Sequence, residues 1–164
     1  MNRKVRVDQC DVGKGVFAET QLPKGEVILY ITGRILDRAQ NDSIYLEGEN
    51  SVQVASDAYI DPTYPAVFLN HSCDPNAGID SDLRLIALRD IEANEEIRFD
   101  YSTSMLERNW TMKCLCGAFN CRGVIDDFDR LPRSVRDFYI DRHVVQDFII
   151  DELSDAGERD ESAA

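Results

Sequence analysis

Four cysteines with zinc-ligand spacing are the residues of this chain best suited to chemistry. Cys114, Cys116 and Cys121 form the pattern C-x-C-x-x-x-x-C around Gly117, and Cys73 stands alone upstream. Three clustered thiolates and one distant thiolate can surround a zinc ion tetrahedrally, and a glycine eases the tight loop between them. Chance clustering of reduced cysteines is the alternative, since disulfides between such close neighbours are geometrically awkward. A site closed by four cysteines has no open position, so we expect a structural metal.

Two further candidates, Asn70 and His71, precede Cys73 in the segment N-H-S-C. Asn70 offers both hydrogen-bond donors and an acceptor, which suits holding the ammonium or carboxylate of a small ligand. An isolated histidine is more often structural than catalytic. We do not expect His71 to bind metal, because the only other histidine, His143, falls in a segment with helical spacing.

Two other features leave their roles open at this point. Gly13-Lys14-Gly15-Val16-Phe17 is a glycine loop that could bring backbone groups close to a ligand, but an isolated G-x-G is more typical of a plain β-turn. Tyr101 follows Asp100 at the end of a predicted strand. A tyrosine there is usually a core or surface residue, although its hydroxyl could instead orient a reacting amine.

Length and composition limit the function classes. The chain has 164 residues with 43% hydrophobic and 30% charged residues, which suits one globular domain. The formal net charge of −13 disfavours direct nucleic acid binding and would attract a basic substrate, although solubility alone also explains it. We find no apolar run long enough for a membrane span and no secretory signal, so the default compartment is the cytoplasm with reduced thiols. The fifth cysteine, Cys10, lies outside the zinc pattern, and we interpret it as a small buried apolar residue.

Short strands dominate the elements that the sequence predicts. They cover residues 5–7, 16–18, 26–31, 43–46, 52–54, 59–60, 83–88 and 97–101, while residues 66–69 fit either a helical turn or a strand. Apolar residues recur at helical spacing from residue 132 to 153, which predicts one or two amphipathic helices packed on the body or at a dimer contact. The acidic tail is expected to be disordered from about Ser154.

In their order along the chain, these motifs resemble those of SET-domain protein lysine methyltransferases with a post-SET zinc motif. The resemblance covers roughly residues 5 to 123, and the N-H-S-C and post-SET motifs are highly specific in combination. The stretches that carry it are Gly13–Ala18, Leu22–Glu26, Ile60–Asp61, Phe68–Asn76, Ala87–Ile91, Glu95–Tyr101 and Cys114–Cys121. Arg34, Val67 and Asn94 depart from the family pattern, which bears more on substrate recognition than on cofactor binding.

The resemblance implies a mainly β (α+β) fold, a SET-domain β-clip of small sheets with a pseudoknot. In that fold, the segment ending at Tyr101 threads under the N-H-S-C loop. The implied organisation is a SET domain at 3–107, a post-SET zinc segment at 108–125, a C-terminal helical extension at 126–153 and the acidic tail at 154–164.

The resemblance also implies S-adenosyl-L-methionine as cofactor and zinc as a structural ion. The glycine loop would contact the cofactor through the backbone of residues 14–16, Asn70 through side chain and backbone, and His71 through backbone near the adenine, which Leu115 would cover. Tyr101 would be the catalytic tyrosine. The implied cofactor-binding residues are Lys14, Gly15, Val16, Phe17, Asn70, His71, Tyr101 and Leu115, and the implied zinc ligands are Cys73, Cys114, Cys116 and Cys121.

The implied reaction is attack of a neutral lysine amine on the sulfonium methyl group. Free lysine has a pKa of about 10.4, and a narrow apolar channel beside the sulfonium charge would lower it. Phe99 falls at the family's phenylalanine/tyrosine switch position, so we expect transfer of two or three methyl groups. We name Phe99 with Tyr101 as the catalytic pair.

The expected substrate is a lysine in a basic protein such as a histone tail, with no direct nucleic acid or membrane partner. A nuclear or chromatin-associated location would fit that substrate, and residues 132–153 could form a homodimer contact. Two alternatives stay open: a catalytically silent SET-like module that binds a peptide or partner, and a structural zinc protein. The presence of Asn70, His71 and Tyr101 argues against a silent module.

Overall fold

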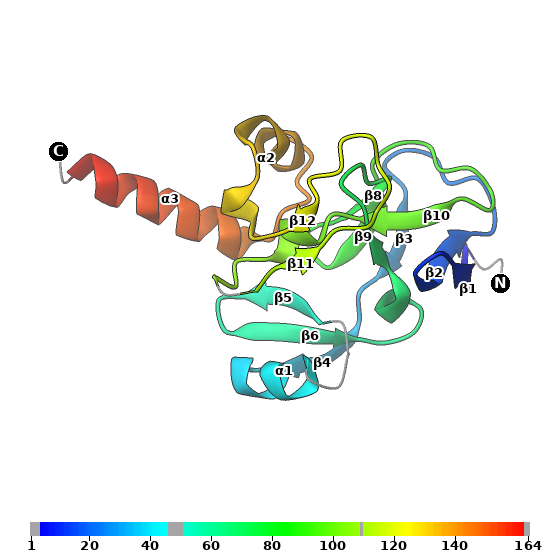
Figure 1. The fold of residues 1–164 in the computed structure, drawn as a ribbon, viewed down its shortest axis with the longest axis horizontal. Helices are drawn as coiled ribbons and strands as arrows, with labels where there is room; N and C mark the ends of the chain where they lie inside the picture. Colours follow the sequence, from blue (N-terminus) through cyan, green and yellow to red (C-terminus); the bar gives the residue numbers. More distant parts are fainter. Residues whose placement is uncertain (1–3, 46–50, 109, 163–164) are drawn as a thin grey trace.

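The computed structural model describes residues 4–45, 51–108 and 110–162. It consists mostly of short strands in four small sheets, with three α-helices and three 3-10 turns among these residues (Figure 1). The predicted mainly β fold is therefore confirmed. The strands are β1 (Val5–Cys10), β2 (Gly13–Ala18), β3 (Val27–Tyr30), β4 (Gly33–Leu36), β5 (Val52–Ala55), β6 (Ala58–Pro62), β7 (Asn70–His71), β8 (Ala77–Ile79), β9 (Arg84–Ala87), β10 (Glu96–Phe99), β11 (Met112–Lys113) and β12 (Val124–Ile125).

The sheet with strand order β1-β2-β10-β7 brings distant motifs together. β1 and β2 form an antiparallel hairpin, and β10 continues the sheet beside β2. β7 then pairs with β10 in parallel, with Asn70 opposite Arg98 and His71 opposite Phe99. The backbone N–H of Ser72 extends this pairing by donating to the Phe99 carbonyl at 3.0 Å. The N-H-S-C segment consequently lies alongside the segment that leads into Tyr101.

Two three-stranded sheets, ordered β3-β9-β8 and β4-β6-β5, complete the body. The main core lies between the sheets and is apolar, as the alternation in the strands predicts. Its fully buried members include Val16, Leu85, Ile91 and Ile97. β4 and β6 approach so closely that a Cβ at Gly33 would overlap the Asp61 carbonyl, so no larger residue fits there.

The helix α1 (Arg38–Tyr45) corrects the prediction of a strand at 43–46, of which residue 46 lies outside the described part. Asp37 Oδ1 accepts from the Gln40 N–H at 2.9 Å, and Gln40 Oε1 accepts from the Asp37 N–H at 3.0 Å. This reciprocal pair satisfies two backbone donors at the helix start. Its stabilisation of the helix exceeds the strand preference of the Ile-Tyr pair at the other end. Residues 66–68 form a 3-10 turn, one of the two forms expected.

Tyr101 does not end a strand, as we expected, but begins the 3-10 turn Tyr101–Ser104. The Asp100 side chain starts that turn by accepting the Ser102 N–H at 3.1 Å. This local hydrogen bond turns the chain two residues beyond β10 and swings Tyr101 out of the strand direction.

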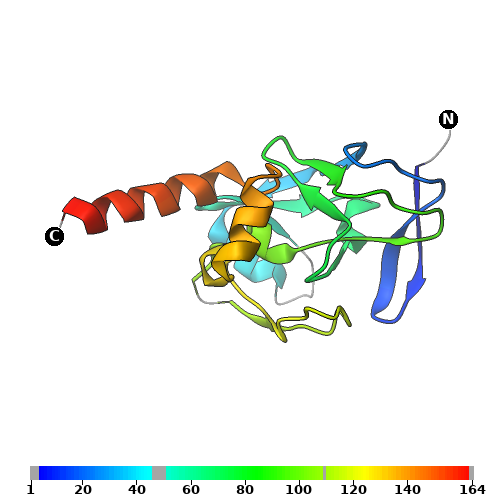
Figure 2. The same cartoon turned by 90° about the horizontal axis from the view of Figure 1, so that it is seen from above.

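Residues 132–153 form two helices, α2 (Arg133–Ile140) and α3, which starts at Asp147 and ends at Ser162. α2 and the first turns of α3 build a second buried core with Leu106 and Phe128, so this segment packs on the body. Figures 1 and 2 both show the rest of α3 leaving the body. α3 runs past Ser154, from which the sequence predicts disorder, since a helix already anchored at its start extends without a new nucleation cost.

No helix among the described residues combines the length and the apolar character that a membrane crossing would require.

Candidate functional site

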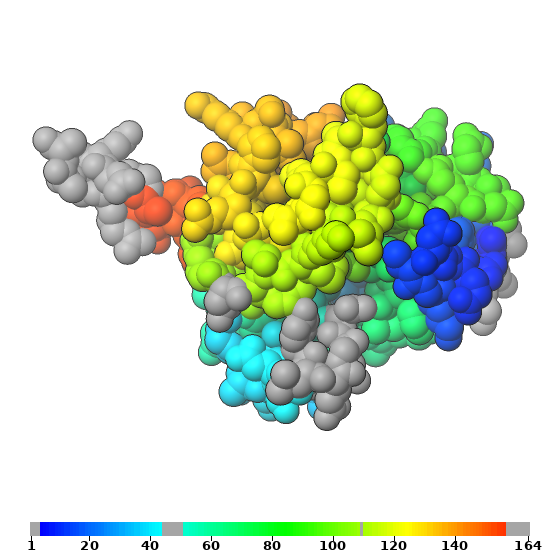
Figure 3. Space-filling model, viewed as in Figure 1, coloured from blue at the N-terminus to red at the C-terminus, as the bar shows by residue number. Residues whose placement is uncertain are grey.

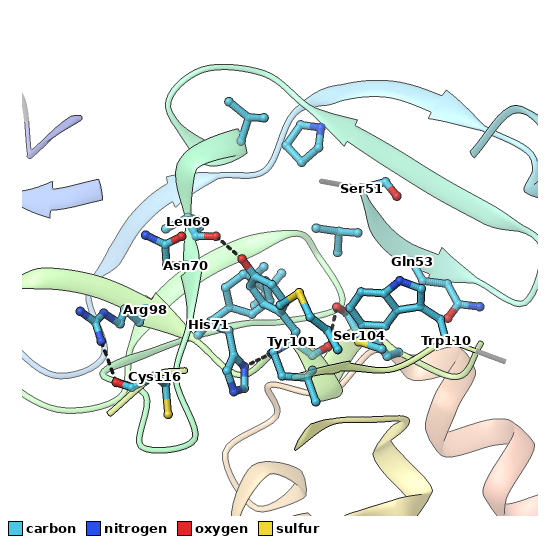
Figure 4. A pocket seen from close by; sticks show the side chains of 18 of the residues that line it. Ser51, Gln53, Leu69, Asn70, His71, Arg98, Tyr101, Ser104, Trp110 and Cys116 are labelled. Carbon is cyan, nitrogen blue, oxygen red and sulfur yellow. Dashed lines mark hydrogen bonds between the residues drawn. The ribbon is translucent and has the colours of Figure 1, made fainter. Parts of the chain in front are cut away.

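A cavity of about 620 Å³ opens between the N-H-S-C segment, the turn at Tyr101 and the cysteine-rich segment. In Figure 4, Asn70, His71, Tyr101 and Cys116 surround one part of it, and Gln53, Ser104 and Trp110 lie toward the other part. Figure 3 shows the segment around residues 112–125 running across this face of the molecule. The cavity thus joins the motifs that the sequence left far apart.

Tyr101 is held through both its hydroxyl and its backbone. Its hydroxyl donates to the Leu69 carbonyl at 2.8 Å, and its backbone N–H donates to His71 Nδ1 at 3.2 Å. Its ring lies 5.0 Å from the Phe99 ring and 5.3 Å from the His71 ring, between centroids. These contacts fix one orientation of the phenol at the cavity wall.

Burial raises the pKa of the Tyr101 hydroxyl, and the negative charge of Glu96 raises it further. The hydroxyl therefore remains protonated at neutral pH. It can orient another group by hydrogen bonding, but it does not serve as a base.

His71 is also neutral at ordinary pH. Burial lowers its pKa to about 4, with Arg122 and Arg98 acting in the same direction against the opposing charge of Asp100. Because Nδ1 accepts the Tyr101 N–H, the proton must lie on Nε2, which is 3.3 Å from Cys73 Sγ. His71 is thus a fixed link between Tyr101 and the cysteine cluster.

Asn70 links the glycine loop to β10. Its amide nitrogen donates to the Lys14 carbonyl at 2.9 Å and to Glu96 Oε1 at 2.8 Å, with Cys10 Sγ 3.4 Å away. A Cβ at Gly15 would overlap the Glu96 carboxylate, which explains the glycine. No sequence motif pointed to Glu96 as a site residue. Cys10, predicted to be a small buried apolar residue, is half-buried beside Asn70.

Glu96 places a largely buried carboxylate beside Asn70. Its side chain is 8% exposed and forms an ion pair with Arg98, whose Nη1 donates to the Cys116 carbonyl at 3.3 Å. The alternation of charged and apolar residues at 96–99 could have predicted this ion pair, because it places Glu96 and Arg98 on one face of β10.

Within the glycine loop, Val16 and Phe17 do not line the cavity. Val16 is fully buried in the main core, and Phe17 is half-buried with Arg6 stacked 5.5 Å from its ring centroid. The Lys14 ammonium lies 5.2 Å from the Phe68 ring centroid. The Lys14 carbonyl is the group of this loop that hydrogen-bonds to Asn70.

The cysteine cluster forms around the short β11-β12 hairpin. The sulfur atoms of Cys73 and Cys114 are 3.7 Å apart, and the Cys73 N–H points to Cys116 Sγ at 3.5 Å. The thiols of Cys116 and Cys121 both interact with that of Cys114. Ligand atoms of Cys73, Cys114, Cys116 and His71 all lie within 4.8 Å of one another. In the described part of the chain this group includes a histidine that we did not expect there, and it does not include Cys121.

The thiols differ in how readily they lose a proton. Burial raises the pKa of Cys73 and of Cys114. Burial acts likewise on Cys116, but backbone hydrogen bonds from Cys73 and Ala118 outweigh it and lower that pKa to about 7. A divalent cation would favour the thiolate at each position, because only the thiolate is a ligand.

Leu115 lies between two of these cysteines and lines the cavity with a side chain that is 71% exposed. Gly117 follows with a φ of 71°, a backbone conformation that a residue with a Cβ adopts only under strain. An exposed apolar side chain on a tight loop at the rim can cover a bound ligand.

Several known proteins are similar to this chain in sequence. The chain is 32% identical over 130 residues to the histone-lysine N-methyltransferase Set2 of Drosophila melanogaster, and 31% identical over 130 residues to a variant-silencing SET domain-containing protein of Plasmodium falciparum. It is 28% identical over 138 residues to the histone-lysine N-methyltransferase ASHR3 of Arabidopsis thaliana. These alignments cover 69%, 66% and 74% of this chain but only 6%, 5% and 27% of the relatives.

The family match covers more than half of the chain. Residues 13–102, from the glycine loop through the N-H-S-C segment to the turn at Tyr101, match the SET domain. The chain belongs to the SET domain family.

Proposed function

We propose that this protein is an S-adenosyl-L-methionine-dependent protein-lysine N-methyltransferase. The observation that carries the proposal is the cavity itself, because one continuous space is lined by Asn70, His71, Phe99, Tyr101 and Leu115. A methyl donor and a lysine side chain must meet in such a space, with the reacting atoms aligned.

The polar groups around Asn70 suit the charged end of the cofactor. Asn70, the Lys14 carbonyl and the Glu96 carboxylate place acceptors and negative charge together, which favours an ammonium and a sulfonium group. The Leu115 side chain supplies an apolar cover for a flat aromatic base. When bound, the cofactor supplies an electrophilic methyl group.

The cysteine cluster suits zinc. Cys73, Cys114, Cys116 and Cys121 would provide four thiolates, and a donor set made only of sulfur is typical of a structural zinc site. His71 would remain outside this set and donate from Nε2 to Cys73, as ligand sulfurs commonly receive such bonds. The metal would hold Leu115 and Cys116 against the cavity.

The side chains at the turn suit a substrate amine. Phe99 and Tyr101 form an apolar wall, which disfavours a charged ammonium and promotes the neutral nucleophile. The protonated Tyr101 hydroxyl and the Leu69 carbonyl would aim the amine. No protein base is required, because an uncharged amine can enter from solvent at a modest cost in free energy.

The substrate class that fits is a basic protein segment. The net charge of −13 favours encounter with such a partner rather than with nucleic acid, and Asp11, Asp42 and Glu107 line the cavity. Two of the relatives described above are named as histone-lysine methyltransferases. We therefore propose a histone or similarly basic protein as substrate, with action in the nucleus or on chromatin.

The test is transfer of labelled methyl groups from S-adenosyl-L-methionine to histones and other basic proteins. We expect transfer by the wild type, a large loss in Tyr101→Phe with cofactor binding retained, and loss of both transfer and binding in Cys73→Ser. Equal transfer by wild type and Tyr101→Phe would remove Tyr101 from the catalytic role. Absence of cofactor binding by the wild type would favour a peptide-binding module instead.

Phe99 bears on the number of methyl groups transferred. Its ring is 3% exposed and packs 5.0 Å from Tyr101, without a hydroxyl that would hold a water molecule there. We predict di- or trimethylated lysine as the final product, and a shift toward monomethylation in Phe99→Tyr. Mass spectrometry of the product checks this, and strictly monomethylated product from the wild type would contradict it.

A further inference from the structure

Asp100 is a carboxylate without solvent contact, and it receives hydrogen bonds from separate parts of the chain. Its side chain is 0% exposed. Oδ1 accepts from Arg122 Nη2 at 2.8 Å and from the Ser102 N–H at 3.1 Å, and Oδ2 accepts from the Tyr139 hydroxyl at 2.8 Å. His71 Nδ1 lies 3.5 Å from Oδ1. A buried charge is stable only when it is paired and hydrogen-bonded in this way.

Arg122 connects Asp100 to the cysteine cluster. It directly follows Cys121, and its backbone N–H points to Cys73 Sγ at 3.4 Å. Its guanidinium reaches Asp100 and, at 3.4 Å, the Ser102 hydroxyl. The position of this one residue therefore depends on both Asp100 and the cysteines.

Tyr139 connects Asp100 to helix α2. Its side chain is 2% exposed and packs in the C-terminal core with Phe128 and Ile149. Burial, and then the charge of Asp100, raise the pKa of its hydroxyl, which remains a donor at all ordinary pH values. α2 lies beyond residues 13–102, so the family match does not account for this contact.

We propose that Tyr139 is a positioning residue, through which helix α2 holds Asp100 and Arg122 and so fixes the cysteine cluster against the cavity. The inference rests on the proposed zinc site. In this arrangement the C-terminal extension contributes to the site. The segment that carries Leu115 stays in position only while Asp100 accepts hydrogen bonds from both Arg122 and Tyr139.

The alternative is that Tyr139 only fills the core. Tyr139→Phe keeps the ring and removes the hydroxyl, whereas Ile149→Val loosens the same core without touching Asp100. Both variants are expected to fold, and Ile149→Val serves as the control for lost stability. The two explanations then differ in what happens at the cysteine cluster.

The experiment measures zinc release from the full chain to a coloured chelator, at a temperature where all variants are folded. We expect release from Tyr139→Phe to be faster by about tenfold, the size of one hydrogen bond to a charged group, and near the wild-type rate in Ile149→Val. Amide hydrogen exchange over residues 114–123 should quicken only in Tyr139→Phe. Equal rates in both variants would overturn the proposal.

A double-mutant cycle completes the test. Asp100→Asn keeps the shape but removes the charge, so adding Tyr139→Phe to it should have a smaller effect on zinc release than in the wild type. Additive effects would contradict the proposed link. Neither readout involves methyl transfer, and amide exchange needs no metal, so failure here differs from failure of the proposed enzyme activity.

Discussion

At the scale of single residues, the cavity is defined by a few side chains that hold each other in place. Asn70, Glu96 and Arg98 form a continuous line from the Lys14 carbonyl to the Cys116 carbonyl. Asn70 could be predicted as a site residue from the sequence, because it stands in a specific motif. Its partner Glu96 could not, because only the pairing of β7 with β10 brings residue 96 near residue 70.

Glu96 carries the residue-scale prediction. Glu96→Gln should weaken binding of S-adenosyl-L-methionine by about tenfold, because it removes the charge that holds Asn70 and Arg98 and that favours a cationic ligand. Isothermal titration calorimetry measures the effect. The control is Glu92→Gln at an exposed position in the same segment. Identical affinities for Glu96→Gln and wild type would rule out this role.

At the scale of elements, most strands were predictable because apolar alternation and turn residues are local signals. β6 and β9 fall where the sequence places strands. α1 was missed although Asp37 and Gln40 stand at capping-box spacing, because β-prone residues at its end outweighed the start signal. The turn at Tyr101 was missed because the Asp100 side chain, not the backbone pattern, ends the strand direction.

Packing of the C-terminal segment on β8 gives an element-scale prediction. A Cβ at Gly78 would lie 2.7 Å from Val144 Cβ, so Gly78→Ala should lower the free energy of unfolding by about 1–3 kcal/mol through overpacking. Combined with Val144→Ala, the two losses should be less than additive, because alanine removes the two methyl groups at 2.8 and 3.0 Å, although it keeps the Cβ at 2.7 Å. Urea denaturation measures both changes. Strictly additive losses would show that the two elements do not meet there.

The turn before β10 gives a prediction for pH. Hydrogen bonds from Arg89 and Asn76 lower the pKa of the Glu95 carboxyl, although burial acts in the opposite direction. A carboxyl whose folded pKa lies below its unfolded value of 4.5 stabilises the fold above that pH, and this stability is lost as the pH falls through the folded value. Melting temperatures of Glu95→Gln should therefore vary less than those of the wild type below about pH 4.5. Parallel acid profiles would contradict this.

At the scale of the whole molecule, two cores share one site. The main core holds the sheets, and the C-terminal core holds α2 and the start of α3. The cysteine-rich segment lies between them, with Cys73 from the sheet side and Arg122 reaching the carboxylate that Tyr139 also holds. The sequence predicted the mainly β body, the C-terminal helices and the cysteine motif. The contacts of Asp100 with both Arg122 and Tyr139 arise only from long-range packing.

In the proposed function, a metal-held segment completes the methyl-transfer site. The most direct measurement is mass spectrometry of a lysine-rich histone substrate after incubation with S-adenosyl-L-methionine and either zinc-loaded, zinc-stripped or zinc-restored protein. We predict methylated lysine with the loaded protein, its loss after stripping because folding and metal binding are linked, and its return after zinc is added back. Undiminished methylation by fully stripped protein, or none by loaded protein, would contradict the account.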